Sequence, residues 1–194
     1  AKVLHSRCVE IAKKYGVELL VCSSLNRNSG TIVRENTKME KMLISGVAAD
    51  KNVAKIRVAG LGNDPDSTFK LLNLLDKNNL NIDVMIQSLG KDGTKSVSFT
   101  VAKTDLNRTL EVLSANKGQL GIQKLDSDEK VAKVSVIGAG IRSHSGVAAK
   151  MFGALANAGI NTEMVTTSEI RITALINEDY TDLAMRAIHE TFLE

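Results

Sequence analysis

Two stretches of the chain show the same order of hydrophobic and polar positions. Each begins with apolar residues that alternate with polar ones, 53–58 in the first stretch and 131–137 in the second, and this period of two predicts a strand. Apolar residues spaced near 3.6 then predict an amphipathic helix, around 69–75 and over 146–157. The elements predicted next are strands 81–87 and 96–101 with helix 104–115, and strands 161–167 and 170–176 with helix 179–192.

The residues repeat as well as the pattern. Residues 53–60 match 131–138, and residues 80–85 match 160–165, so the chain holds two copies of one module. The first copy continues into one more predicted strand, 119–124. The resulting order, βαββαβ, predicts the ferredoxin-like α+β fold, in which an antiparallel sheet carries two helices on one face.

The second copy lacks this fourth strand, so its sheet would keep an unpaired edge. Residues 42–48 form a strand-like run upstream of the first copy. We expect this run to complete the second sheet, which would insert the first module within the second. The modules are therefore predicted at 53–125 and at 42–49 plus 129–194.

Residues 1–35 predict too little structure for a domain of their own. Residues 7–15 have the pattern of a helix, and 17–23 and 30–33 are strand-like. One helix with two short strands buries too little surface to fold alone. We expect this segment to be the tail of a larger domain.

Composition narrows the classes of function. The chain has 194 residues, and 43% of them are hydrophobic, which predicts a globular fold. Its net charge of +3 is too small to indicate nucleic acid or a membrane as partner. Aromatic residues make up only 3%, which disfavours base stacking. Cys8 and Cys22 are too few for a disulfide framework, so we expect two buried thiols and a cytoplasmic protein.

Three segments carry a resemblance to a known family. Residues 136–147 (VIGAGIRSHSGV) are close to the motif VGAGMRSHPGV of aspartate kinase, 166–170 (TTSEI) are close to its STSEI, and 23–31 look like the last strand and turn of its kinase domain. Along essentially its whole length, the chain resembles the C-terminal portion of aspartate kinase, including the tandem ACT regulatory region. It departs from the family at Asn63, where Asp is common, and at Ser145, where Pro is common.

The resemblance implies an amino-acid sensor. Aspartate kinase phosphorylates aspartate with ATP and Mg²⁺, the first step of lysine, threonine and methionine biosynthesis, and lysine, threonine or both bind its ACT domains as feedback inhibitors. Residues 1–35 would be the end of the amino-acid kinase domain. Because the ATP and aspartate sites precede this region in the family, we expect the chain to be non-catalytic alone, without a cofactor or metal of its own. ACT modules pair side by side, which implies a homodimer or pairing with a catalytic chain.

The expected effector sites lie at the strand-to-helix turns 60–68 and 141–147. An α-amino acid requires backbone N–H groups at a helix start for its carboxylate, and carboxylate or amide oxygens for its ammonium. By resemblance, one type of site comprises Asn63, Asp66, Ser67, Gln87, Asn161 and Thr162. Its counterpart comprises Ser143, His144, Ser145, Gly146, Val147, Glu163, Ser168 and Glu169.

Other interpretations of the same residues stay open. Each Asn or Ser on these turns is equally suited to cap a helix or form a turn, and the modules would then be structural dimerisation units that bind no effector. An RNA-binding module of the RRM type shares the βαββαβ order but needs aromatics on its central strands, where Phe99 is the only candidate. The residues predicted to form a turn between the modules are Asp126, Asp128 and Glu129.

Overall fold

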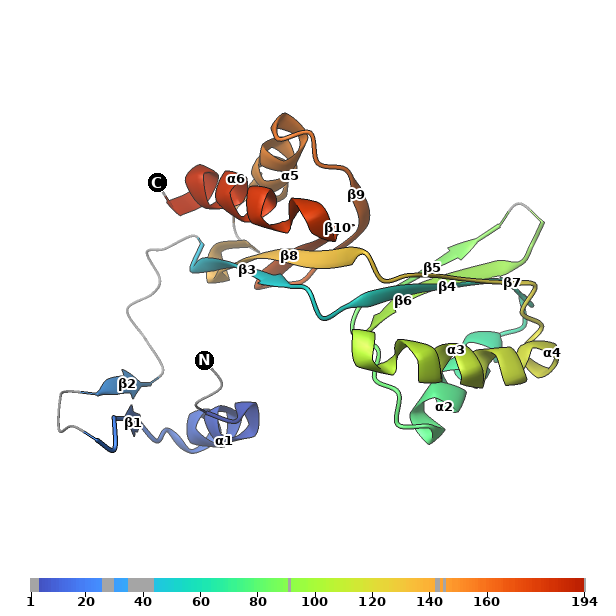
Figure 1. Ribbon diagram of the computed structural model, residues 1–194, viewed down its shortest axis with the longest axis horizontal. Helices are drawn as coiled ribbons and strands as arrows, with labels where there is room; N and C mark the ends of the chain where they lie inside the picture. The colour runs from blue at the N-terminus through green and yellow to red at the C-terminus, as the bar shows by residue number, and fades with distance from the viewer. Residues whose placement is uncertain are drawn as a thin grey trace. The chain divides into compact units, whose positions relative to one another are not determined.

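The computed structural model describes residues 4–25, 30–34, 44–90, 92–141, 144 and 146–193. The chain divides into two compact units, Ala1–Lys41 and Met42–Glu194. The first contains a helix and a two-stranded sheet, and the second contains two four-stranded sheets with their helices (Figure 1). No helix in these described stretches is long and apolar enough to cross a membrane.

The first unit has the elements that its pattern predicts. Helix α1 (Ser6–Tyr15) is followed by β1 (Leu19–Val21) and β2 (Thr31–Val33), which pair antiparallel. The prediction of two buried thiols is wrong, because Cys8 on α1 and Cys22 after β1 are both exposed. One helix and two short strands enclose too little interior to cover them.

The first module follows the predicted order of elements. These are β4 (Ala54–Leu61), α2 (Ser67–Lys77), β5 (Met85–Leu89), β6 (Lys95–Val101), the 3₁₀ helix η2 (Lys103–Asp105), α3 (Leu106–Ala115), α4 (Lys117–Leu120) and β7 (Lys124–Asp128). The strands form an antiparallel sheet in the order β5-β6-β4-β7. The helices cover one face of this sheet (Figure 1).

The second module has the same architecture, with one strand supplied from upstream. Its own elements are β8 (Val131–Ile137), η3 (Ala139–Ile141), α5 (Val147–Asn157), β9 (Thr162–Thr167), β10 (Arg171–Asn177), η4 (Glu178–Tyr180) and α6 (Thr181–Leu193). Strand β3 (Gly46–Asp50) pairs antiparallel with β8, and the sheet order is β3-β8-β10-β9. Helices α5 and α6 lie on one face of it (Figure 1).

The predicted insertion of one module in the other is therefore confirmed. The consecutive strands β3 and β4 belong to different sheets, so the chain starts the second sheet, builds the whole first module and then returns. The exchanged strand covers residues 46–50 rather than 42–48, and residues 42 and 43 lie outside the described part of the chain. The predicted boundaries of the modules stay a prediction.

Each module buries its own core between its sheet and its helices. Alternate residues of β4, Ile56 and Val58, pack against Leu71 and Leu75 of α2, and all four are essentially inaccessible to solvent. Burying an aliphatic side chain of this size contributes about 1.5–3 kcal/mol. The corresponding residues of the second module are Val134 and Val136 of β8, Met151 and Leu155 of α5 and Ile188 of α6.

Two strands of the first module are displaced from their predicted positions. The fourth strand is β7, at 124–128 rather than 119–124, because residues 117–120 form the short helix α4. Asp126 and Asp128 therefore lie in an edge strand rather than in a turn. The signal was weak because β7 has a single apolar residue, Leu125, and so shows no alternation.

The second displaced strand is β5, which begins at Met85 rather than at residue 81. The two residues before it contact β6 in another way, since the N–H groups of Asp83 and Val84 donate to the backbone oxygen and to the hydroxyl of Thr100, each at 3.1 Å. At Val84, the hydroxyl of Thr100 thus accepts the hydrogen bond that a backbone oxygen accepts in a regular strand pair. A pattern of hydrophobic residues does not predict this.

Among the residues that the structure describes, a smaller cluster and three ion pairs join the two modules. Val53, just before β4, and Val131, the first residue of β8, pack with Val84, Met164 and Leu175. The ion pairs that link the modules are Lys55–Glu163, Lys103–Glu178 and Lys133–Asp83. The junction between the modules is therefore both packed and charge-paired.

Candidate functional site

The first predicted site begins where β4 ends. The ladder between β4 and β6 shifts between Ala59 and Leu61, and Gly60 at this shift has a φ of 85°. A Cβ atom at Gly60 would lie 2.4 Å from the side chain of Gln123. Both the backbone angle and the space therefore favour glycine here, and the chain leaves the sheet into the turn that carries Asn63.

The helix that follows this turn starts without a side-chain cap. Asp66 occupies the N-cap position, but its carboxylate makes no capping hydrogen bond and pairs instead with Lys70 at 2.7 Å. The hydrogen bond from Lys70 lowers the pKa of Asp66. Because the first N–H groups of a helix have no intrahelical acceptor, the start of α2 offers donors to a bound carboxylate.

Polar side chains from the neighbouring strands converge on this helix start. The hydroxyl of Thr68, in the first turn of α2, donates to Oε1 of Gln87 on β5 at 2.6 Å. The ammonium of Lys95, the first residue of β6, donates to the backbone oxygen of Asp64 at 2.8 Å and lies 3.2 Å from Oγ of Ser67. The structure thus brings a cation, an amide and two hydroxyls to one end of the sheet.

Sequence reasoning assigned neither Thr68 nor Lys95 to this site. Thr68 lies within the predicted turn 60–68, and a hydroxyl in the first turn of a helix is a signal that was available. Lys95 had no local signal, because it reaches the turn only through the antiparallel pairing of β4 with β6, in which it stands opposite Leu61.

Two of the six residues predicted for this site lie elsewhere in the chain. Asn161 and Thr162 stand at the start of β9, and the neighbouring Glu163 pairs with Lys55 at the start of β4. Asn63 follows the other end of β4, and an eight-residue strand is about 25 Å long. Within one chain, the structure gathers Asn63, Asp66, Ser67 and Gln87 but not Asn161 and Thr162.

The second predicted site lies at the corresponding end of the second sheet. The N–H of Gly138, directly after β8, donates to the backbone oxygen of Ile170 at 3.0 Å, which joins the loop before α5 to the hairpin between β9 and β10. In that hairpin, the N–H and the hydroxyl of Ser168 donate to the backbone oxygen of Arg171, at 2.7 and 3.3 Å. Ser168 and Glu169 are exposed next to this loop.

The loop itself reaches helix α5 through a glycine. Gly146 has a φ of 105° and leaves the helix start without a side-chain cap. Val147 is 3% exposed and packs in the core, so only its backbone is available to a ligand. His144 is exposed, and Ser143 and Ser145 lie outside the described residues.

Within one chain, the structure does not bring Glu163 to this second site. Glu163 and Ser168 lie on opposite ends of β9, five residues apart, which in a strand is about 16 Å. The carboxylate of Glu163 is instead paired with Lys55 of the first module. Periodicity placed Glu163 on the correct strand but could not tell which end of that strand faces the turn.

Two of the hollows among the described residues bear on the sites, and the one at the junction of the modules is lined in part by Ser168 of the second predicted site. One, of about 510 Å³, lies at the junction of the modules and is lined by Asp50, Asp83, Lys133 and Arg171 among others. The other, of about 410 Å³, lies in the first unit. Among the described residues, no group of three or more His, Cys, Asp or Glu side chains is placed to hold a metal ion.

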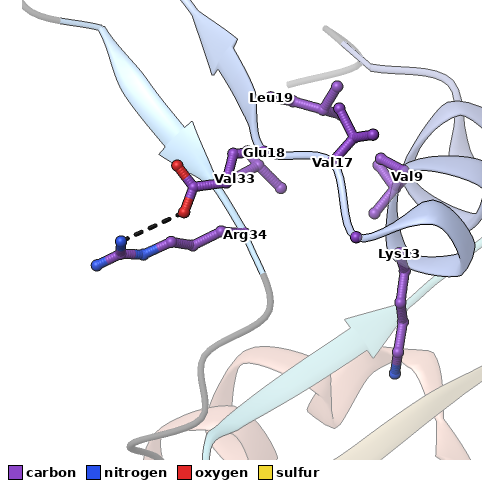
Figure 2. A pocket seen from close by; sticks show the side chains of 9 residues that line it. Val9, Lys13, Val17, Glu18, Leu19, Val33 and Arg34 are labelled. Carbon is purple, nitrogen blue, oxygen red and sulfur yellow. Dashed lines mark hydrogen bonds and ion pairs between the residues drawn. The ribbon is translucent and has the colours of Figure 1, made fainter.

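The hollow in the first unit lies between α1 and the two-stranded sheet (Figure 2). Val9, Val17 and Leu19 line it, and an ion pair between Glu18 and Arg34, at 3.4 Å, links the two strands. Its surface is mainly apolar, and neighbouring side chains such as Leu20 and Leu25 are strongly exposed. This unit exposes the kind of surface that other parts of a larger domain would cover.

The fold and these turns define a class of protein. The family of the ACT domain matches residues 134–192, which lie within the second module. The tandem ferredoxin-like modules, each with a polar strand-to-helix turn, agree with the ACT domain that this match identifies.

Comparison with known proteins narrows the class to one family. An aspartate kinase of Stutzerimonas stutzeri is 40% identical over 194 residues, which cover 99% of this chain and 47% of the relative. The solved aspartokinase alpha and beta subunits match with 43% identity and a TM-score of 0.72, over 77% of this chain and 98% of that one. The ligand-free regulatory subunit of aspartate kinase from Thermus thermophilus matches with 34% identity and a TM-score of 0.73, over 77% and 99%.

The chain belongs to the aspartate kinase family and carries its C-terminal ACT regulatory region. It spans about half the length of the curated relatives that it matches.

Proposed function

We propose that this chain is the effector-sensing part of an aspartate kinase. Lysine, threonine or both bind its ACT modules and inhibit the parent reaction, in which ATP and Mg²⁺ in the kinase domain convert L-aspartate to 4-phospho-L-aspartate. The observation that carries the proposal is the convergence of Thr68, Gln87 and Lys95 on the uncapped start of α2. Family membership supports it independently.

The first site suits both charged ends of an α-amino acid. The α-carboxylate would accept hydrogen bonds from N–H groups in the first turn of α2, beside the ammonium of Lys95. The α-ammonium would donate to the amide oxygens of Gln87 and Asn63. A hydrogen bond to a charged group contributes about 1.5–3 kcal/mol, so two or three of them suffice for selective binding of a small ligand.

The second site relies on the backbone and one carboxylate. The loop before α5 and the start of that helix would hold the effector's carboxylate, and Glu169 would face its ammonium. Ser168 would supply a hydroxyl. Ser143 and Ser145, also assigned to this site by resemblance, lie outside the described residues.

Complete sites require a second chain. Asn161 and Thr162 cannot reach the turn of their own first module, so we assign them to the first-module site of a paired chain. The edge strands β5 and β9 support such pairing, because Ile86, Leu89 and Val165 are exposed on them and each edge has unpaired backbone groups. The partner would be a second copy or a catalytic aspartate kinase chain.

Inhibition follows if the effector binds the inactive arrangement more tightly than the active one. A preference of about 100-fold corresponds to roughly 2.7 kcal/mol of coupling. The effector must therefore contact residues whose positions differ between the two arrangements, and a site shared between chains satisfies this requirement when the pairing of the chains changes.

The RNA-binding alternative loses its one candidate residue. Phe99 is 1% exposed and lies in the core beneath the helices, so no base can stack on it. The structural alternative, dimerisation without an effector, remains a possible outcome of the test below.

Calorimetric titration of the purified chain with lysine and with threonine tests the proposal. We expect at least one of them to bind, and Gln87→Ala to weaken that binding while the oligomeric state and the thermal stability stay unchanged. Gln119→Ala, an exposed amide on α4, is the matched control and should bind as the wild type does. Absence of binding by both amino acids at millimolar concentration would refute effector sensing by this chain.

A further inference from the structure

Lys133 makes a charged contact across the junction of the two modules. Its neighbours on β8, Val134 and Ala132, are fully buried, whereas Lys133 lies on the opposite face of the strand. Its ammonium lies 3.2 Å from the carboxylate of Asp50 on β3 and also pairs with Asp83 of the first module. The Lys133 side chain is only 15% exposed, whereas those of Asp50 and Asp83 are 50% and 59% exposed, so in this ion triad an enclosed ammonium meets two carboxylates that face solvent.

The first-module end of this triad leads directly to the first candidate site. Asp83 is held against β6 by its N–H, which donates to the backbone oxygen of Thr100, and Val84 donates to the hydroxyl of the same residue. Strand β5 starts immediately afterwards and carries Gln87. A shift of Asp83 therefore moves the strand that presents Gln87 to α2.

The second-module end leads to the other candidate site. Lys133 stands on β8, which ends at Ile137 and enters the loop before α5. Two residues beyond Lys133, the hydroxyl of Ser135 lies 2.8 Å from that of Thr173, in a buried contact that ties β8 to β10. Strand β10 begins next to the hairpin that carries Ser168. A displacement of β8 would therefore move both the loop before α5 and this hairpin.

The surroundings of the triad leave room for movement. A hollow of about 510 Å³ lies directly beside it, with Ala48 on one wall and Met85 on another. The apolar cluster of Val53 and Val131 packs the junction at a neighbouring point. The modules thus contact each other through a packed apolar cluster and through an ion pair that borders the hollow.

We propose that Lys133 couples the two effector sites within one chain, by linking the segment that leads into β5 to the strand that leads into the loop before α5. This proposal rests on the proposed function, since it assigns a regulation to the same two sites. An effector that repositions β5 would move Asp83 relative to Lys133, and through β8 would change the affinity of the second site. By linkage, the second effector changes the first site by the same factor.

The effector-free part of the test is amide hydrogen exchange. Lys133→Met keeps most of the aliphatic chain and removes the positive charge. Asp83→Asn removes the negative charge on the first-module side of the contact. Lys124→Met is the control, because it breaks an ion pair with Asp126 (2.8 Å) inside the first module. We expect exchange at residues 83–89 to rise about threefold or more in the first two variants and to stay unchanged in the control. Unchanged exchange in both junction variants would overturn the proposal.

The second part is titration with L-lysine and L-threonine, alone and each at saturation of the other. In the wild type we expect the two amino acids to change each other's affinity by about fivefold or more. In Lys133→Met this factor should fall close to one, while each single affinity stays within about threefold of the wild-type value. A coupling factor that survives in Lys133→Met contradicts the role of Lys133, as does a wild type in which both amino acids bind without affecting each other.

The two proposals fail in different ways. If neither amino acid binds to the wild type, effector sensing is refuted and so is the coupling of effectors, but raised exchange in Lys133→Met still establishes the mechanical link between the segments. If both bind and exchange is insensitive to Lys133, effector sensing stands and the coupling proposal falls.

Discussion

The two modules share one fold but differ in how they build the end of the sheet where the helix begins. In the first, side chains from three elements meet at the turn, as Thr68, Gln87 and Lys95 show. In the second, the described contacts run from the N–H of Gly138 to the backbone oxygen of Ile170 and from the N–H and hydroxyl of Ser168 to that of Arg171, and Ser143 and Ser145 lie outside the described residues. A repeated fold therefore does not imply two equivalent sites, because the turn residues, and not the sheet, decide the chemistry.

The completion of the sheets differs as well. The first module takes its outer strand, β7, from the residues directly after its last helix, whereas the second takes β3 from before the first module. Because β3 and β8 pair across the whole first module, the second sheet forms only when the two ends of that module come together. The predictions below test how independent the modules are, from the largest expected effect to the smallest.

The largest effect is expected from truncating the first core. Phe99 on β6 is 1% exposed, and Phe99→Ala should lower the free energy of unfolding by about 3–5 kcal/mol, as such cavities usually do. Urea unfolding followed by circular dichroism measures the change. Phe69→Ala, at a 66% exposed position of α2, is the control and should change stability by less than about 0.5 kcal/mol.

In the second module, Ile172 of β10 is 2% exposed and pairs with Val136 of β8, and Ile172→Ala should cost about 2–5 kcal/mol. If the modules unfold independently, each variant will shift a different part of the unfolding curve. One common transition that shifts in both variants shows instead that the exchanged strand and the charged junction make the modules cooperative, which is the result we expect.

The glycines that lead out of β4 and into α5 should differ in their cost of substitution. Gly60 and Gly146 both have positive φ, which costs about 1–2 kcal/mol for another residue. Gly60→Ala would in addition press on Gln123, whereas no atom of the residues that the structure describes lies within 4 Å of a Cβ at Gly146. We therefore expect Gly60→Ala to be the more destabilising in a thermal melt, and equal shifts of Tm would contradict the close approach at Gly60.

Effector affinity should respond differently to substitutions in the two candidate sites. Gln87→Ala should weaken the effector held by the first module by about 10-fold or more, since it removes a hydrogen bond to a charged group worth about 1.5–3 kcal/mol. Ser168→Ala should weaken binding at the second site by less, because the Ser168 hydroxyl already donates to the backbone of Arg171. Calorimetry on both variants checks the order of the two effects.

The smallest effect concerns the alkaline limit of stability. Burial lowers the pKa of Lys133, but its hydrogen bonds and charge interactions with Asp83 and Asp50 outweigh burial, so the pKa is raised above its ordinary value of 10.5. A raised pKa means that the charged pairing stabilises the fold below pH 10.5 and that this contribution is lost as the pH rises through the folded-state pKa. The difference in unfolding free energy between the wild type and Lys133→Met should therefore be constant from pH 7 to 9 and shrink above about pH 10.5. A difference that grows with pH would show that the triad does not stabilise the charged lysine.

Regular elements were the part of the fold that the sequence predicted best. Strand β8 has the predicted bounds, and α5 begins within one residue of its predicted start, because both have strong local periodicity. Strand β7 was displaced because an edge strand with one apolar residue has no pattern to detect. Strand β5 was displaced because the hydroxyl of Thr100 takes the place of a backbone partner.

The sequence predicted the parts of the candidate sites whose residues are neighbours along the chain, but not the parts that strand pairing brings together. Asn63, Asp66 and Ser67 lie within one turn, so their proximity follows from the sequence alone. Gln87 lies on β5, the strand after the helix, as its predicted strand has it. Lys95 was missed because it reaches the turn only through strand pairing. The resemblance grouped Glu163 with the second site, whereas within one chain it lies at the other end of β9.

The sequence by itself determined the repeat, the order of elements in each module and the exchange of a strand, because these follow from short-range periodicity and from counting strands. Only the tertiary structure decided which ends of the strands meet. The contacts of Lys55 with Glu163 and of Lys133 with Asp83 join residues far apart in the chain. They depend on the twist of two sheets and the packing of the junction, and no local pattern encodes these.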